Sequence, residues 1–146
     1  MISKNPKDTE KIAKDFIQKL LSAGQKTKGA TIVALSGELG AGKTAFTKNI
    51  AKHLGIKQKV NSPTFVIMKK YPVKKNTGYK YMFHLDAYRL KNERELMHIG
   101  WDKIVTEKEH LIFIEWPENV AKAIPRGTKK IKISHGKNGI RIFKIN

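Results

Sequence analysis

Hydrophobic residues recur along the chain at two different spacings, and the first is that of a helix. Apolar positions three and four residues apart predict helices over residues 8–23, 43–54 and 92–100. Asp8 or Thr9 stands where the N-cap of the first helix is expected, and Gly24 stands where that helix should end. Gly55 is expected to end the second helix in the same way.

Short apolar runs between turn residues predict strands. These lie at residues 31–36, 64–73, 79–88, 110–116, 129–134 and 140–145. A polar turn at 74–78 joins two of them, and a turn at 135–139 closes a C-terminal antiparallel hairpin. A strand, a glycine-rich loop and a helix followed by further strands indicate the α/β class, without a linker or an internal repeat. At 146 residues the chain is long enough to bury a core, so we expect one domain over residues 1–146.

The chain is strongly basic, since 30 Lys and Arg against 12 Asp and Glu give a formal net charge of +18. Only four basic residues are Arg, and no acidic residue lies between Glu38 and Asp86 or after Glu118. A field of this sign attracts polyanions, including nucleotides and RNA. A lysine-rich solvated surface explains the same composition, because lysine lacks the forked donor geometry of specific phosphate recognition. The charge alone leaves both interpretations open.

Three absences from the sequence narrow the class of protein. No apolar run approaches the roughly 18 residues that a membrane-spanning helix needs. Residues 1–16 are polar and have neither an apolar signal core nor a transit pattern. The sequence contains no Cys, which excludes disulfides and thiolate zinc sites. Together these features suit a cytoplasmic protein that does not act at a membrane.

The segment GELGAGKT, residues 37–44, fits the pattern G-x-x-x-x-G-K-[ST], with a predicted strand before it and a predicted helix after it. Glycines in such a loop allow backbone N–H groups to approach phosphate oxygens closely, and the helix N-terminus favours an anion. Lys43 can reach the β- and γ-phosphates, and the Thr44 hydroxyl can ligate Mg²⁺. A simple glycine turn before an amphipathic helix would leave the Lys and Thr unexplained. The motif therefore predicts a site for a Mg²⁺-nucleotide.

Two carboxylates follow apolar strand residues after this loop, Asp86 in YMFHLD and Glu115 in LIFIE. Both lie near the C-terminal ends of their strands, and in open α/β sheets that edge holds the ligand crevice. They are therefore predicted to hold the metal and to order its water. By contrast, four carboxylates in polar surroundings are expected to be solvated helix or loop charges: Glu93, Glu95, Glu107 and Glu109.

The segment NSPTF, residues 61–65, offers Ser62 and Thr64 as hydroxyls that could sense the γ-phosphate, although an ordinary Ser-Pro turn is the alternative. The guanine-reading N-K-x-D motif is absent, which favours ATP, and the protein-kinase signatures are absent as well. The five His show no spacing typical of metal ligands, and His84 is expected to pack beside its strand.

Five segments occur in this order along the chain: LSGELGAGKTAFTKNIAKHLGI, VNSPTFVIMKKY, YMFHLDAYRL, ELMHIGWDKI and LIFIEWPE. Together they resemble the TsaE (YjeE) family, small bacterial P-loop ATPases of tRNA threonylcarbamoyladenosine biosynthesis. The resemblance covers nearly the whole chain. The S-P-T-F, H-x-D-x-Y-R-L and I-E-W-P-E motifs in this order make it more specific than the P-loop alone.

The resemblance implies a P-loop NTPase-like, three-layer fold in which helices flank a mixed, mostly parallel sheet. It also implies a weak, Mg²⁺-dependent ATPase that uses ATP and does not itself transfer the threonylcarbamoyl group. The implied partners are TsaD-like and TsaB-like subunits, which modify adenosine 37 of tRNA. Contact of this chain with tRNA is then at least indirect.

Carried over position by position, the resemblance implies catalytic roles for Lys43, Asp86 and Glu115. It also implies that Thr44, Glu115 and Asp86 surround the metal. Which carboxylate ligates Mg²⁺ directly stays open, and we favour Glu115. The implied nucleotide-binding residues are Thr9, Gly37, Leu39, Gly40, Ala41, Gly42, Lys43, Thr44, Ala45, Thr64 and Trp116.

Two other functions fit parts of the sequence. A small-molecule kinase could use the same P-loop, and Arg89 with Arg94 would then belong to its phosphate-binding lid. A non-enzymatic RNA-binding protein would draw on the net charge of +18. The sequence shows no aromatic-rich surface for reading RNA, so the ATPase interpretation comes first and the kinase second.

Overall fold

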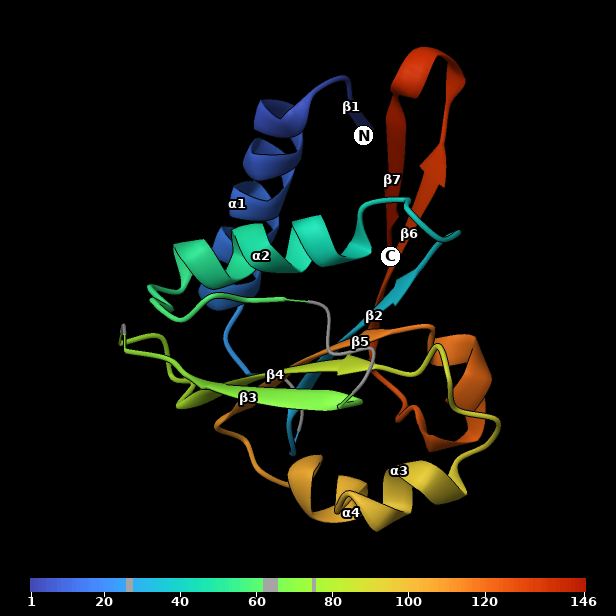
Figure 1. The fold of residues 1–146 in the computed structure, drawn as a ribbon. Helices are drawn as coiled ribbons and strands as arrows, with labels where there is room; N and C mark the ends of the chain where they lie inside the picture. The colour runs from blue at the N-terminus through green and yellow to red at the C-terminus, as the bar shows by residue number, and fades with distance from the viewer. Residues whose placement is uncertain (26–27, 62–65, 75) are drawn as a thin grey trace.

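The computed structural model describes residues 1–25, 28–61, 66–74 and 76–146, and within them seven strands form one sheet (Figure 1). The strands are β1 (Ile2–Ser3), β2 (Thr31–Ser36), β3 (Met68–Pro72), β4 (Tyr81–Asp86), β5 (His110–Glu115), β6 (Lys129–His135) and β7 (Arg141–Ile145). The helices are α1 (Pro6–Ser22), α2 (Lys43–His53), α3 (Arg94–His98) and α4 (Trp101–Ile104), and the 3₁₀ segments are η1 (Pro117–Ala123) and η2 (Lys137–Gly139).

Parallel strands occupy the centre of the sheet, whose order is β1-β7-β6-β2-β5-β4-β3. The strands β6, β2, β5 and β4 pair in parallel, whereas β1, β7 and β3 pair antiparallel at the two edges. The α/β class, the mixed sheet and the C-terminal hairpin are confirmed, with parallel pairing in three of the six contacts between described strands. Because parallel strands end at the same edge, the residues that end β2, β4 and β5 come together there.

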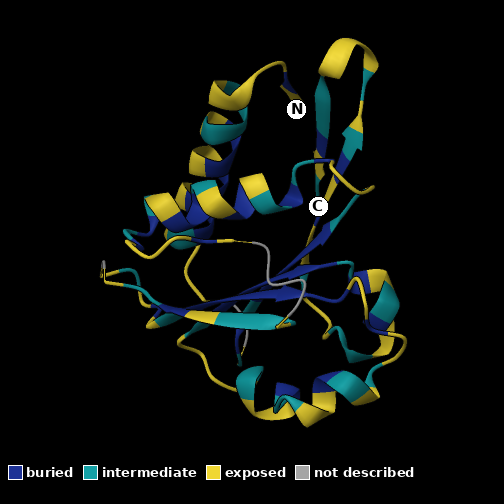
Figure 2. Ribbon diagram, in the orientation of Figure 1, coloured by how far each residue is buried: buried dark blue, intermediate teal, exposed yellow. Residues whose placement is uncertain are grey.

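Helices cover both faces of the sheet and give the expected three layers (Figure 1). On the face of α1 and α2, the ring centroid of Phe46 lies 5.8 Å from that of Phe16 and 5.7 Å from that of Phe143. On the face of α3 and α4, Leu96 and Trp101 are buried against the strands. The central strands are coloured as buried in Figure 2. Strands covered on both faces read as continuous apolar runs, which is why their positions were predictable.

The first helix begins earlier than the sequence predicts, and its N-cap is a different residue. Helix α1 begins at Pro6, and the side chain of Asn5 accepts a hydrogen bond of 3.0 Å from the backbone N–H of Asp8. Proline fits the first helical position because no helical hydrogen bond needs its missing N–H. The prediction of Asp8 or Thr9 as N-cap is therefore wrong. The predicted stop is confirmed, since Gly24 follows the helix with a left-handed φ of 69°.

We expect Asn5→Ala to lower the free energy of unfolding by about 1 kcal/mol, because it removes the N-cap acceptor of α1. Asn5→Ser is the matched control, since serine also caps helices well and should keep most of the stability. Urea-induced unfolding of the two variants and the unmodified protein measures the difference. Equal stabilities of the alanine and serine variants would contradict the capping role.

The structure contains several short elements that the sequence did not predict. β1 has two residues and depends on antiparallel pairing with β7, in which Ile2 lies opposite Ile142. α4 and η1 are also short, and β3 begins at Met68 rather than at residue 64. Residues 62–65 lie outside the described residues. Among the helices that the structure describes, none combines the length and apolar character needed to cross a bilayer.

Candidate functional site

The glycine-rich loop runs from β2 into α2, as the motif predicts. Gly42 is the N-cap of α2 and has a φ of 107°, in the left-handed region that favours glycine. Gly37 lies so close to β6 that a Cβ atom would collide with the carbonyl oxygen of Ile133. The first backbone N–H groups of a helix lack acceptors within the helix, and its dipole favours negative charge. A loop with this geometry could hold a phosphate group.

The ammonium group of Lys43 lies folded against this loop. Its Nζ donates hydrogen bonds to the carbonyl oxygens of Gly37 at 2.6 Å and Glu38 at 2.9 Å. The ring centroid of Trp116 lies 4.4 Å from Nζ, within the range of a cation–π contact. Phosphate oxygens are charged acceptors and would bind this ammonium more strongly than neutral carbonyl oxygens do.

Burial and the neighbouring carboxylates have opposite effects on the pKa of Lys43. Burial lowers the pKa of the Lys43 ammonium from its ordinary value, because the charged form loses hydration. The carboxylates of Glu115, Asp86 and Glu118 shift the same pKa in the opposite direction. Additional negative charge beside Nζ would therefore favour the charged lysine further.

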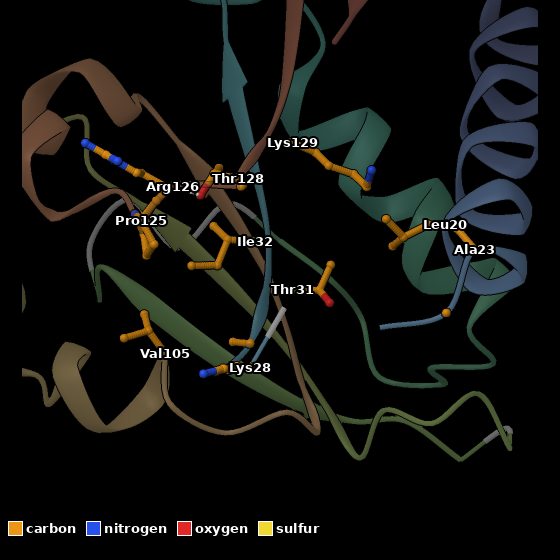
Figure 3. A pocket seen from close by; sticks show the side chains of 14 residues that line it. Leu20, Ala23, Lys28, Thr31, Ile32, Val105, Pro125, Arg126, Thr128 and Lys129 are labelled. Carbon is orange, nitrogen blue, oxygen red and sulfur yellow. Dashed lines mark hydrogen bonds between the residues drawn. The ribbon is translucent and has the colours of Figure 1, made fainter. Parts of the chain in front are cut away.

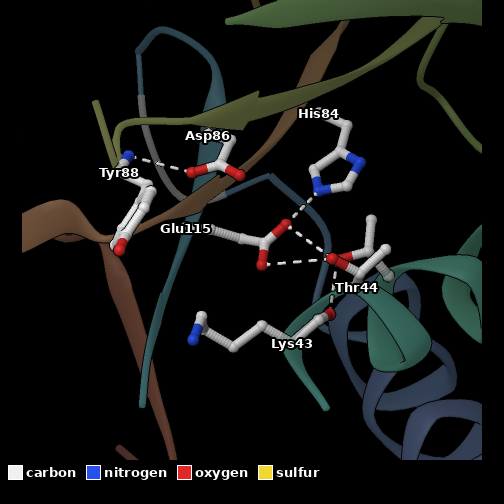
Figure 4. Close-up of polar contacts among 7 residues, drawn as sticks. Lys43, Thr44, His84, Asp86, Tyr88 and Glu115 are labelled. Carbon is white, nitrogen blue, oxygen red and sulfur yellow. Dashed lines mark hydrogen bonds and ion pairs between the residues drawn. The ribbon is translucent and has the colours of Figure 1, made fainter. Parts of the chain in front are cut away.

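Asp86 and Glu115 meet at the ends of two adjacent parallel strands. They are register partners in β4 and β5, and their exposed fractions are 5% and 3%. Thr44 Oγ1 donates toward the Glu115 carboxylate, 3.1 Å from Oε2 and 3.3 Å from Oε1 (Figure 4). Asp86 Oδ1 accepts a hydrogen bond of 2.9 Å from the backbone N–H of Tyr88. The structure thus brings the P-loop hydroxyl and both predicted carboxylates together.

These side chains have the chemistry of a divalent cation site. Two buried carboxylates on neighbouring strands repel each other unless positive charge lies close to them. Carboxylate and hydroxyl oxygens are donors that Mg²⁺ accepts. Within the described ranges, no group of three or more His, Cys, Asp or Glu side chains is arranged to hold a metal ion. The set Thr44, Asp86 and Glu115 therefore fits a cation that phosphate oxygens and water also hold, as is usual for Mg²⁺.

His84 also belongs to this cluster, a position that was not predicted from the sequence. Its ring is fully buried, and Nε2 lies 2.6 Å from Glu115 Oε2. The expectation that His84 merely packs beside its strand is corrected, because the ring points at the carboxylate (Figure 4). A signal was available in the sequence. His84 and Asp86 are two residues apart in one strand, so their side chains share a face of the sheet.

A cavity of about 270 Å³ opens beside these groups. Its lining contains most of the predicted nucleotide and metal residues, together with Tyr88, which was not predicted: Leu39, Gly40, Gly42, Lys43, Thr44, Ala45, Asp86, Tyr88, Glu115 and Trp116. Leu39 is 73% exposed at its rim. Trp116 has a left-handed φ of 59°, uncommon for a residue other than glycine, and its ring lies 5.0 Å from that of Tyr88. This cavity is our candidate phosphate and metal site.

A second cavity, of about 430 Å³, shares Gly40, Gly42 and Ala45 with the first. The predicted residue Thr9 lines it, and so does Arg141, whose Nη2 lies 3.4 Å from the carbonyl oxygen of Gly40. Sequence analysis did not include Arg141 in the nucleotide set, because only the folding of the C-terminal hairpin brings it to the loop. The predicted residue Thr64, and Ser62 beside it, lie outside the described residues, so their role stays a prediction.

A further cavity, of about 470 Å³, lies at the opposite end of β2 from the P-loop (Figure 3). Its lining includes Thr31 at the start of β2, Val105 and Pro125, together with the basic residues Arg126 and Lys129. None of its described lining residues is acidic. It therefore lacks the carboxylates that a Mg²⁺ site requires.

Comparison with known proteins identifies the family to which the sequence and the fold are similar. The family model described as "Threonylcarbamoyl adenosine biosynthesis protein TsaE" matches residues 3–142. The Bacillus subtilis protein named "tRNA threonylcarbamoyladenosine biosynthesis protein TsaE" is 37% identical over 129 residues, covering 88% of this chain and 73% of that protein. A Rickettsia prowazekii protein of the same name is 33% identical over 141 residues, covering 96% and 89%. The crystal structure of YdiB from Bacillus subtilis has a TM-score of 0.72 and 28% identity, covering 99% of this chain and 82% of that one.

Proposed function

The chain belongs to the TsaE family of threonylcarbamoyl adenosine biosynthesis proteins, and from this premise we propose that it is a Mg²⁺-dependent ATPase of tRNA modification. The observation that carries the proposal is the contact between the P-loop hydroxyl of Thr44 and the buried carboxylate of Glu115. Through this contact the P-loop meets Glu115, the last residue of β5, and both line the same cavity. Both parts are needed to bind a nucleotide together with its metal.

Phosphate binding is assigned to the loop and to Lys43. Backbone N–H groups at the start of α2 donate to phosphate oxygens, and Lys43 exchanges the carbonyl oxygens of Gly37 and Glu38 for the β- and γ-phosphates. The exchange is favourable because charged acceptors replace neutral ones. We assign the nucleoside part of ATP to the adjoining cavity of Thr9 and Arg141, which shares three loop residues with the phosphate cavity.

Thr44 and Glu115 are the proposed Mg²⁺ ligands, with Asp86 beside them. Bound Mg²⁺ would neutralise charge on the phosphates and stabilise the charge that develops as the terminal phosphoryl group leaves. Asp86 is held in the same cavity by the backbone N–H of Tyr88 and is assigned to ordering the attacking water. Trp116 covers Lys43 and limits the access of bulk water to the ammonium.

The biological setting follows from the family. The relatives are named for tRNA threonylcarbamoyladenosine biosynthesis, and we propose that this chain supports TsaD-like and TsaB-like partner subunits in that pathway. Contact with tRNA is then at least indirect, and the cytoplasm is the proposed location. One sheet carries both hydrophobic cores, which supports treating residues 1–146 as a single P-loop ATPase domain.

Asp86→Ala separates nucleotide binding from hydrolysis. With γ-labelled ATP and Mg²⁺, the unmodified protein should release labelled inorganic phosphate, and Asp86→Ala should do so about 10²-fold more slowly. Its affinity for ADP should change little, as read from the fluorescence of Trp116 beside the cavity. Asp102→Ala, at an exposed position, is the control. Transfer of the label to a small acceptor rather than to water would contradict the proposal and indicate a kinase.

A further inference from the structure

A fully buried histidine contacts the carboxylate that the proposed function assigns to Mg²⁺. The 2.6 Å contact between His84 Nε2 and Glu115 Oε2 is shorter than either contact of that carboxylate with Thr44. Within the part of the chain that the structure describes, His84 Nδ1 has no hydrogen-bond partner. A proton on Nδ1 would be a buried donor without an acceptor, which is unfavourable. The tautomer that fits carries its proton on Nε2 and donates it to Glu115.

The contact gives the two oxygens of Glu115 different surroundings. Both oxygens lie within reach of Thr44 Oγ1, Oε2 at 3.1 Å and Oε1 at 3.3 Å, but only Oε2 also accepts the hydrogen bond from His84. In Figure 4 His84 and Lys43 approach the carboxylate from opposite sides. The imidazole therefore holds Oε2 on the side away from Lys43, so that Oε1 lies on the side of Lys43.

The hydrogen bond also restricts the rotation of the carboxylate. The terminal torsion of a glutamate side chain is broad, so an unrestrained carboxylate samples many orientations. The His84 ring is fully buried in β4, which pairs with β5 on one side and β3 on the other, and it can hold the Glu115 carboxylate in one orientation. Ligands that are oriented before the metal binds hold it more tightly, and loss of such an orienting partner typically lowers metal affinity about 10–100-fold.

We propose that His84 is a positioning residue, whose Nε2–H holds Glu115 Oε2 so that Oε1 is presented to Mg²⁺. The inference rests on the proposed function, because it requires that Glu115 ligates the metal. It adds a residue that neither the P-loop nor the strand-end carboxylates include. The role needs a hydrogen-bond donor at the position of Nε2 and does not need a charge on the imidazole.

The matched variants His84→Gln and His84→Met test this role. Their side chains have similar length and shape, but only glutamine carries a donor near the position of Nε2. The measurement is the affinity for ADP by isothermal titration calorimetry, first in EDTA and then over a series of Mg²⁺ concentrations. His84→Met is expected to bind ADP in EDTA as the unmodified protein does and to need about 10–100-fold more Mg²⁺ for the same gain in affinity. His84→Gln should keep most of the gain in ADP affinity that Mg²⁺ gives to the unmodified protein.

The outcomes separate this inference from the proposed function. Unchanged Mg²⁺ dependence in His84→Met would overturn the positioning role while the metal site stands. Equal losses in both variants would overturn it as well, because the donor would then make no difference. If His84→Met does not fold, as thermal unfolding will show, loss of Mg²⁺ dependence in a folded His84→Gln protein still contradicts the role. If the affinity of the unmodified protein for ADP does not depend on the Mg²⁺ concentration, both the metal site and this inference are overturned.

Discussion

Lys43→Ala is expected to lower the rate of ATP hydrolysis by at least about 10²–10³-fold, which is the usual cost of removing one group that stabilises transition-state charge. The Lys43 ammonium already lies among the backbone carbonyl oxygens of the P-loop and needs only to exchange them for phosphate oxygens. Alanine leaves the terminal phosphates without this charge as they become more negative during the reaction. The measurement is phosphate release under saturating ATP and Mg²⁺.

Lys48→Ala is the matched control for this experiment. Lys48 lies in the same helix and is exposed, and its substitution also removes one positive charge from a strongly basic chain. Its hydrolysis rate is expected to stay close to that of the unmodified protein. Equal rates for the Lys43 and Lys48 variants would mean that net charge, and not the P-loop lysine, accounts for the activity.

Glu115→Ala is expected to lower the rate of ATP hydrolysis as strongly as Lys43→Ala does, but for a different reason. The carboxylate contacts Thr44 at the P-loop, so its loss removes a proposed metal ligand and leaves the hydroxyl without its acidic partner. We expect ADP to bind as before in EDTA and to gain little affinity on addition of Mg²⁺. Phosphate release together with calorimetric titration of ADP, with and without Mg²⁺, measures both effects.

The Glu115 variant should still fold. Loss of the carboxylate leaves His84 Nε2 without an acceptor, which lowers the free energy of unfolding by about 1–3 kcal/mol. The same change removes the repulsion between Glu115 and Asp86, which favours folding. Glu107→Ala, at an exposed carboxylate, controls for the change in net charge. A folded Glu115→Ala protein that keeps its Mg²⁺-dependent gain in ADP affinity would contradict the assignment of Glu115 as a ligand.

The sequence predicted the parts of the site that depend on local pattern. The P-loop is recognisable because its glycines, Lys43 and Thr44 are consecutive and the neighbouring strand and helix are strongly patterned. Asp86 and Glu115 were predictable as neighbours because parallel strands end at one edge. Their roles as metal and water ligands stay proposals, since position in the fold does not by itself establish chemistry.

The residues that the sequence missed depend on contacts between distant segments. His84 shares a strand face with Asp86, which the sequence shows, but only the pairing of β4 with β5 brings its ring to Glu115. Arg141 reaches the P-loop because β7 folds back beside β6. The N-cap was misplaced because Asp8, Thr9 and Asn5 are all good caps, and Pro6 at the first helical position was the deciding signal.

The most direct test combines this chain with TsaD-like and TsaB-like proteins, the substrates of the modification and unmodified tRNA. Phosphate release and threonylcarbamoyladenosine formation in the tRNA are measured in the same reaction over many turnovers. We expect phosphate release and tRNA modification to rise together when the unmodified protein is added, and both to be lower with Lys43→Ala. Sustained modification by the partner subunits in the presence of the Lys43→Ala protein, at the rate that the unmodified protein supports, would contradict the claim that ATP hydrolysis by this chain is its contribution to the pathway.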